Sequence, residues 1–157
     1  MTRAAHRPAA LARSAGVCSA VWSGGFTALH AYWALGGRGF LGSGPQVDAA
    51  FARTGFAVYN GVVTLLCLVG VAAAAGLAVA TRLPRRVVRA ARTVAWSACV
   101  LLLVRGGVGV GQGLLGLAPP AERLAAYDFD PWFLLGGVLF GIAAGCGRRR
   151  SDGGDDG

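Results

Sequence analysis

Apolar residues fall into four long runs, at about 14–36, 56–80, 93–117 and 131–146, separated by polar segments that hold nearly all the charges. A helix of about 20 residues crosses the roughly 30 Å apolar core of a bilayer, at about 1.5 Å per residue. The pattern therefore predicts an all-α fold, a polytopic membrane four-helix bundle. The bundle would cover 14–146 as one transmembrane domain.

The third and fourth runs are less regular than the second, which no charge interrupts. Arg105 lies near the centre of the third run, and a helix that stopped at Val104 would have only about 12 residues, too few to cross. We therefore expect a full crossing with an intramembrane arginine. Before the fourth run, Asp130 and Pro131 are typical of an N-cap followed by proline at the first helical position, so we expect that helix to begin there. Its short apolar part would need local bilayer thinning or arginine snorkelling.

The polar segments define the rest of the organisation. Residues 1–13 are expected to form a cytoplasmic basic leader, and residues 147–157 a disordered cytoplasmic tail. The first run exceeds the apolar region of a signal peptide, typically about 7–15 residues, and is expected to be an uncleaved anchor. The segment Gly37 to Gly55 is too broken by glycine and proline to continue a helix and is expected to be an external loop.

The composition is also typical of a protein surrounded by lipid, since 55% of residues are hydrophobic, 14% are charged and mean hydropathy is +0.56. The formal net charge is +8, and every basic residue is arginine. These arginines flank apolar runs, so a lipid bilayer is the expected partner and nucleic acid is not. They gather before the first run, between the second and third, and after the fourth. The positive-inside rule then predicts a multi-pass protein with cytoplasmic N- and C-termini.

Small residues recur at four-residue spacing, which permits close helix approach in a membrane. The sets are Gly16, Ala20, Gly24 and Ala28 in the first run, Gly107 with Gly111 and Gly109 with Gly113 in the third, and Gly137, Gly141 and Gly145 in the fourth. They predict a tight bundle. The grooves would pack within the chain or against a second copy or another membrane protein.

Arg105 is the strongest candidate for a functional residue. A cation at the bilayer centre costs about 2.5–3.5 kcal/mol on insertion scales, and such residues usually face a bundle interior or an aqueous cavity. Its partner could be Asp128 or Asp130, backbone carbonyls, or an anionic ligand. The structural alternative is an arginine that fixes helix packing by hydrogen bonds.

Further polar and aromatic residues fall in the outer third of the expected bundle, above Arg105. Gln112 lies about two turns after Arg105 on the same helix face. The candidate ligand-binding layer is His30, Trp33, Tyr59, Asn60, Arg105, Gln112, Asp130 and Trp132. The functional interpretation is a pocket that opens outward. The structural alternatives are interfacial aromatic belts and a histidine bonded to Gln112 or to a carbonyl one turn back.

Templates for catalysis and cofactor binding are missing from the sequence, which contains no GxSxG, P-loop or HExxH motif. The four cysteines lie in different apolar runs without metal-ligand spacing, so no metal site is expected. His6 lies in the leader, which disfavours a haem pair with His30. We expect no cofactor and no assigned catalytic residue.

Two segments carry a family resemblance: His30-Ala31-Tyr32-Trp33 with Gly36-Gly37, and Asp130-Pro131-Trp132 with Gly136-Gly137. With Arg105, they resemble a family of small actinobacterial four-helix integral membrane proteins catalogued as a domain of unknown function. The resemblance spans roughly Ala15 to Ala144. It implies a fold and a bacterial inner-membrane location, but no activity.

Three classes of function remain open from the sequence. The first is binding or transport of a small ligand, anionic or quinone-like, in the polar layer around Arg105. The second is a structural or accessory membrane subunit that packs through its glycine grooves. The third and weaker class is an intramembrane enzyme that uses His30 and Asp130 as acid and base.

Overall fold

The computed structural model describes the backbone of residues 6–41, 44–117 and 120–146, and the side chains of these residues except 6–9, 46 and 120–128. Its elements are α1 (His6–Ala34), α2 (Pro45–Phe51), α3 (Thr54–Ala78), a 3₁₀ turn η1 (Ala80–Arg82), α4 (Arg85–Leu114) and α5 (Pro120–Gly145). No strand occurs in these ranges, so the predicted all-α fold is confirmed. The tail and residues 1–5 of the leader lie outside the described residues.

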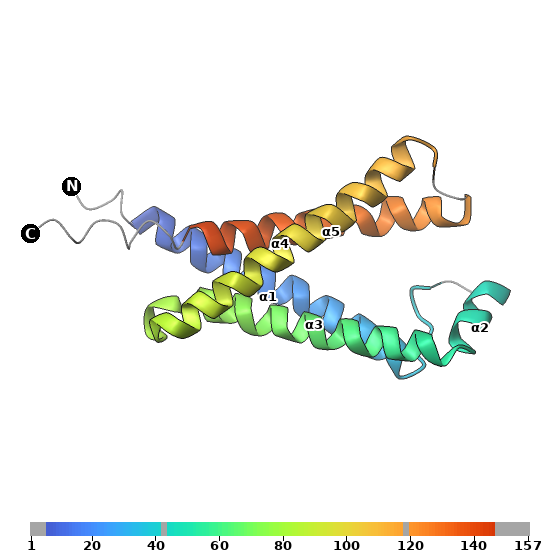
Figure 1. The fold of residues 1–157 in the computed structure, drawn as a ribbon, viewed down its shortest axis with the longest axis horizontal. Coiled ribbons are helices and arrows are strands. Elements are labelled where there is room, and N and C mark those ends of the chain that lie inside the picture. The colour runs from blue at the N-terminus through green and yellow to red at the C-terminus, as the bar shows by residue number, and fades with distance from the viewer. Residues whose placement is uncertain (1–5, 42–43, 118–119, 147–157) are drawn as a thin grey trace, which may run out of the picture.

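The four long helices form two antiparallel pairs, α1 with α3 and α4 with α5. The pairs also contact each other, through α1 with α5 and α3 with α4. They lie together at the end of the molecule where α1 begins, and diverge towards the end that carries α2 (Figure 1).

Small residues set the close approach within each pair. A Cβ atom added at Gly16 of α1 would lie 2.9 Å from the backbone nitrogen of Ala78 in α3. One added at Gly137 of α5 would lie 2.7 Å from Cγ of Leu103 in α4. Both distances are too short for real carbon atoms, so the expected small-residue packing holds at these positions.

Only some of the predicted grooves pack within the chain. Added Cβ atoms at Gly24, Gly107 and Gly111 would meet open space, whereas Gly106 and Gly109 lie against α5. Four-residue spacing alone does not say which face of a helix meets its neighbour. Packing of Gly107 and Gly111 against a second copy or another membrane protein stays a prediction.

The predicted start of the fourth helix at Asp130 is wrong. Helix α5 begins at Pro120, and Pro131 lies inside it. Proline is favoured in the first helical turn, and Pro120 fills that role in place of Pro131. Asp130 does not act as an N-cap, because it lies inside α5, and its carboxylate instead accepts a hydrogen bond from Arg105 on α4.

The glycine-rich segment after α1 is not wholly irregular. It contains α2, which begins at Pro45 after Gly44, a residue with a φ of 144°. As predicted, α1 does not continue into this segment, but Pro45 begins a separate short helix, since its fixed φ suits the first helical position.

The core consists mostly of small side chains and lies where the two pairs meet. Its members are Ala15, Ala73, Ala74, Leu77, Ala91, Ala95, Cys99, Phe140, Ala143 and Ala144. Helices α3 and α4 are long and apolar enough to cross a membrane, and Phe129–Gly145 within α5 is a shorter apolar stretch. The larger apolar side chains of α3 and α4, such as Leu65, Leu66 and Leu101, are mostly exposed.

Candidate functional site

A buried hydrogen bond joins His30 of α1 to Asn60 of α3. Nδ1 of His30 lies 2.7 Å from Oδ1 of Asn60, while Nδ2 of Asn60 donates to the Phe56 carbonyl at 2.8 Å. Because the amide nitrogen is already engaged as a donor, Oδ1 is the acceptor and Nδ1 of His30 is the donor. In a neutral ring, Nε2 of His30 is then left as an acceptor.

This contact packs His30 of α1 against α3. Within the described residues the ring of His30 bonds Asn60, and not the predicted partners, Gln112 or a carbonyl one turn back. Both residues are deeply buried, His30 at 9% exposed and Asn60 at 1%. An unpaired polar group at such a place costs about 1–3 kcal/mol, so the pair fixes the register of α1 against α3.

Aromatic rings surround the histidine. The ring of Phe26 is stacked at 6.2 Å between centroids, and the rings of Trp33 and Tyr59 meet it edge-on at 5.1 and 6.4 Å. Nε1 of Trp33 donates to the Gly39 carbonyl at 2.8 Å, which ties the end of α1 to the following turn. Trp33 is therefore buried by its own loop, while Tyr59 is 62% exposed.

The second polar pair joins α4 to α5. Nη1 of Arg105 donates to Oδ1 of Asp130 at 2.7 Å. The Asp130 side chain is only 3% exposed, whereas that of Arg105 is 59% exposed. Of the two predicted acidic partners, Asp130 is the one that Arg105 contacts, and the side chain of Asp128 lies outside the described residues.

Glycine makes this ion pair possible. A Cβ atom at Gly109 would overlap the carboxylate of Asp130, and one at Gly106 would lie 2.8 Å from the Asp130 backbone carbonyl. Gly109 lies four residues after Arg105, so both face the same side of α4. The arginine and the space for its partner thus come from one helix face.

Two phenylalanines connect the two polar pairs. The guanidinium carbon of Arg105 lies 5.3 Å from the ring centroid of Phe133, within range of a cation–π interaction. The Phe133 ring lies 5.5 Å from that of Phe26, which stacks on His30. Arg105 and His30 are therefore linked across the α1–α5 contact by aromatic rings rather than by direct hydrogen bonds.

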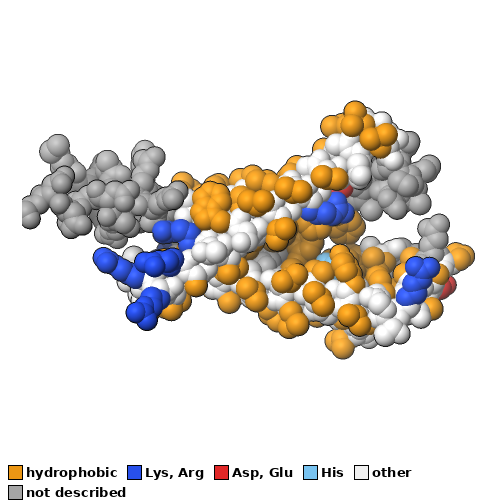
Figure 2. Space-filling model, viewed as in Figure 1, with side chains coloured by type: hydrophobic (Ala, Val, Ile, Leu, Met, Phe, Trp, Pro, Cys, Tyr) orange, Lys and Arg blue, Asp and Glu red, His pale blue; other side chains and the backbone are white. Residues whose placement is uncertain are grey.

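Figure 2 shows a hollow between the two helix pairs on the α2 side of the crossing, with a basic side chain at its upper rim. The side chain of Arg105 is 59% exposed, and its guanidinium has donors left over, because only Nη1 is engaged with Asp130 in the described part of the chain. These donors lie beside the ring of Phe133, which in turn contacts the ring of Phe26 where α5 meets α1.

Two other members of the predicted layer do not join these pairs. Gln112 is exposed, and its side chain makes no hydrogen bond to the described residues. Trp132 is 53% exposed and contributes only its backbone carbonyl, which accepts from Nε1 of Trp22 at 3.1 Å. Sequence reasoning missed Phe26 and Phe133, and it named Gly109 only as part of a packing groove with Gly113. The four-residue spacing between Arg105 and Gly109 was the usable signal for the role of Gly109 beside Asp130.

The remaining reactive side chains do not form a metal site. Within the described ranges, no group of three or more His, Cys, Asp or Glu side chains is placed to hold a metal ion. The four cysteines are free and lie apart, with Cys99 buried and Cys18 exposed.

A family model described as "Protein of unknown function (DUF3995)" matches residues 23–140. The chain belongs to this family. The expected membership of a family of unknown function is thereby confirmed. The DUF3995 match covers both polar pairs and both phenylalanines between them. No curated protein and no solved structure gives a significant match.

Proposed function

We propose that this DUF3995 protein is a bacterial inner-membrane protein in which α1, α3, α4 and α5 span the bilayer. The support comes from exposure: only 22% of the most apolar window of α3 and 17% of that of α4 are buried in the structure. The core helix of a soluble protein is mostly buried, whereas lipid covers such surfaces in a membrane protein. Exposed Leu65, Leu66 and Leu101 would then face acyl chains.

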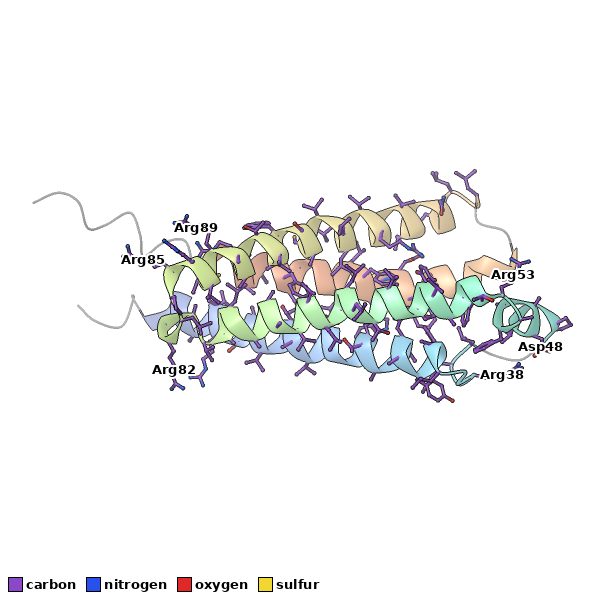
Figure 3. The ribbon with its side chains drawn as sticks, turned by 60° about the horizontal axis from the view of Figure 1, so that its bottom comes forward. Arg38, Asp48, Arg53, Arg82, Arg85 and Arg89 are labelled. Atoms are coloured by element: carbon purple, nitrogen blue, oxygen red, sulfur yellow. The ribbon has the colours of Figure 1, made fainter. Side chains whose placement is uncertain are left out.

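The distribution of arginines supports an orientation. Arg82, Arg85 and Arg89 lie at one end of the bundle, and α2 with Arg38 and Asp48 lies at the other (Figure 3). The arginine-rich end is assigned to the cytoplasm by the positive-inside rule. Both termini are then cytoplasmic, and the hollow beside Arg105 opens outward.

Within this frame, the proposed function is binding or transport of a small ligand in the hollow. The observation that carries it is the exposed guanidinium of Arg105 held by the buried carboxylate of Asp130. Because Asp130 balances the charge, the remaining N–H donors suit a neutral carbonyl acceptor as well as an anion. The rings of Phe133 and Phe26, which lie between Arg105 and His30, suit a flat apolar body. A quinone-like ligand meets both conditions.

The test is native mass spectrometry with an absorption spectrum, on protein purified in mild detergent. The variant Arg105→Leu/Asp130→Asn removes the donors without leaving an unbalanced buried charge. We expect the wild type to retain a small molecule that this variant, folded by circular dichroism, releases. The matched control is Arg38→Gln, because Arg38 pairs with Asp48 beyond the C-terminal end of α1. This control variant should keep the small molecule. Equal retention by all three proteins, or no ligand in the wild type, would contradict the proposal.

A structural or accessory subunit is the second candidate. It is favoured by Gly107 and Gly111 of α4, which face open space instead of a neighbouring helix. A second copy or another membrane protein could approach closely there. The same mass spectrum distinguishes the two candidates, because a bound protein without a small molecule supports the subunit role. The enzyme alternative gains no support, since Asp130 is engaged by Arg105.

A further inference from the structure

We propose that the arginine-rich end of the bundle is a binding surface for the headgroups of anionic phospholipids. The surface is formed by the turn between α3 and α4 and by the first turns of α4. Its exposed members are Arg82, Arg85, Arg86 and Arg89. The inference uses the membrane placement proposed above but not the ligand site in the hollow.

Charge balance is the first argument. The described residues contain two ion pairs, Arg38–Asp48 and Arg105–Asp130, and both lie away from this end. The arginines of the α3–α4 turn therefore have no acidic partner within the described part of the chain. In Figure 3 the side chains of Arg82, Arg85 and Arg89 project from this end of the bundle.

The second argument is the supply of hydrogen-bond donors. The side chains of Arg82, Arg85, Arg86 and Arg89 are all exposed, so their guanidinium N–H groups are open to an acceptor from outside the bundle. Phosphate oxygens accept hydrogen bonds from guanidinium groups in a bidentate manner.

The third argument identifies the phosphate as that of a lipid. The arginines border directly on apolar surface, since Val87 is 46% exposed and Trp96, one turn beyond Arg92, is 42% exposed. Tryptophan at this level is typical of the headgroup region. Basic groups next to a lipid-facing surface attract anionic lipids of the cytoplasmic leaflet. A free phosphate would use the charges but not the adjoining apolar face.

The experiment is native mass spectrometry in detergent with equal amounts of phosphatidylglycerol and phosphatidylcholine. We expect the wild type to prefer phosphatidylglycerol, and the variant Arg85→Gln/Arg86→Gln/Arg89→Gln to lose about tenfold or more of that preference. The matched control, Arg38→Gln/Arg53→Gln, removes arginines from the opposite end and should keep the preference.

Each contrary outcome has a definite meaning. An unchanged preference in the triple variant, or an equal loss in the control, overturns the proposal. Displacement of the lipid by inorganic phosphate at equal concentration overturns the assignment to lipid. The variant Arg105→Leu/Asp130→Asn is expected to keep the lipid preference. The experiment therefore tests lipid binding at the arginine-rich end separately from small-ligand binding beside Arg105.

Discussion

The substitution Gly109→Ala is expected to break the Arg105–Asp130 pair and to destabilise the bundle strongly. The added methyl group would overlap the buried carboxylate of Asp130, which is held between α4 and α5. Overpacking lowers the free energy of unfolding by about 1–3 kcal/mol. Separating the buried Asp130 carboxylate from its partner lowers it by about 3–5 kcal/mol. The measurement is the thermal unfolding midpoint of the purified protein in detergent.

The matched control for this substitution is Gly107→Ala. Gly107 lies on the same helix two residues away, but a Cβ there would meet open space. Alanine favours helix over glycine by up to about 1 kcal/mol, so the control should be unchanged or slightly more stable. Equal midpoints for Gly109→Ala and Gly107→Ala would show that Asp130 does not occupy the space beside Gly109.

The second large effect is expected when one member of the ion pair is removed. Arg105→Leu leaves the Asp130 carboxylate, with 3% of its side chain exposed, without its partner. An uncompensated buried charge destabilises by about 3–5 kcal/mol. The double variant Arg105→Leu/Asp130→Asn removes both charges and should recover much of the lost stability.

Unfolding midpoints of the two single variants and the double variant form a thermodynamic cycle. The cycle isolates the coupling between the side chains from their separate contributions. A coupling near zero would mean that the hydrogen bond from Nη1 to Oδ1 contributes no stability. In that case Arg105 would need another partner to explain its position in an apolar helix.

The helices and their apolar character were predictable, because long uncharged runs leave few alternatives to helices with apolar surfaces. Depth along each run also placed His30 with Asn60, and Arg105 with Asp130, near the same end of the bundle. Position along a helix follows directly from residue number, at about 1.5 Å per residue. The membership of each pair in one layer was therefore accessible from the sequence.

Helix rotation was not accessible in the same way. Successive side chains turn by about 100°, so Gly106 lies against α5 whereas Gly107 faces open space, although the two differ little in depth. The same limit explains why Asn60, rather than Gln112, meets His30. Phe26 and Phe133 were missed because apolar aromatics in an apolar run give no local signal of a contact between two polar pairs.

Pro131 shows a different limit. Proline is common at the start of a helix but also occurs inside apolar helices, where neighbouring groups compensate for the missing N–H. The sequence around Asp130 fitted a helix start, and Asp130 was also one of the possible partners of Arg105. Local sequence did not decide between these two roles. Tertiary contact decided the role of this residue.

The membrane arrangement is the central claim, and reporter fusions test it most directly. Alkaline phosphatase, which is active only outside the cytoplasm, would be fused in a bacterial host after Asp48 and, separately, after Arg89. The four-span arrangement predicts high alkaline phosphatase activity for the fusion after Asp48 and low activity for the fusion after Arg89. A fluorescent protein that folds only in the cytoplasm should give the reverse pattern, with fluorescence only when it is fused after Arg89. Equal alkaline phosphatase activity at the two positions, with both fusions recovered in the soluble fraction, would contradict it.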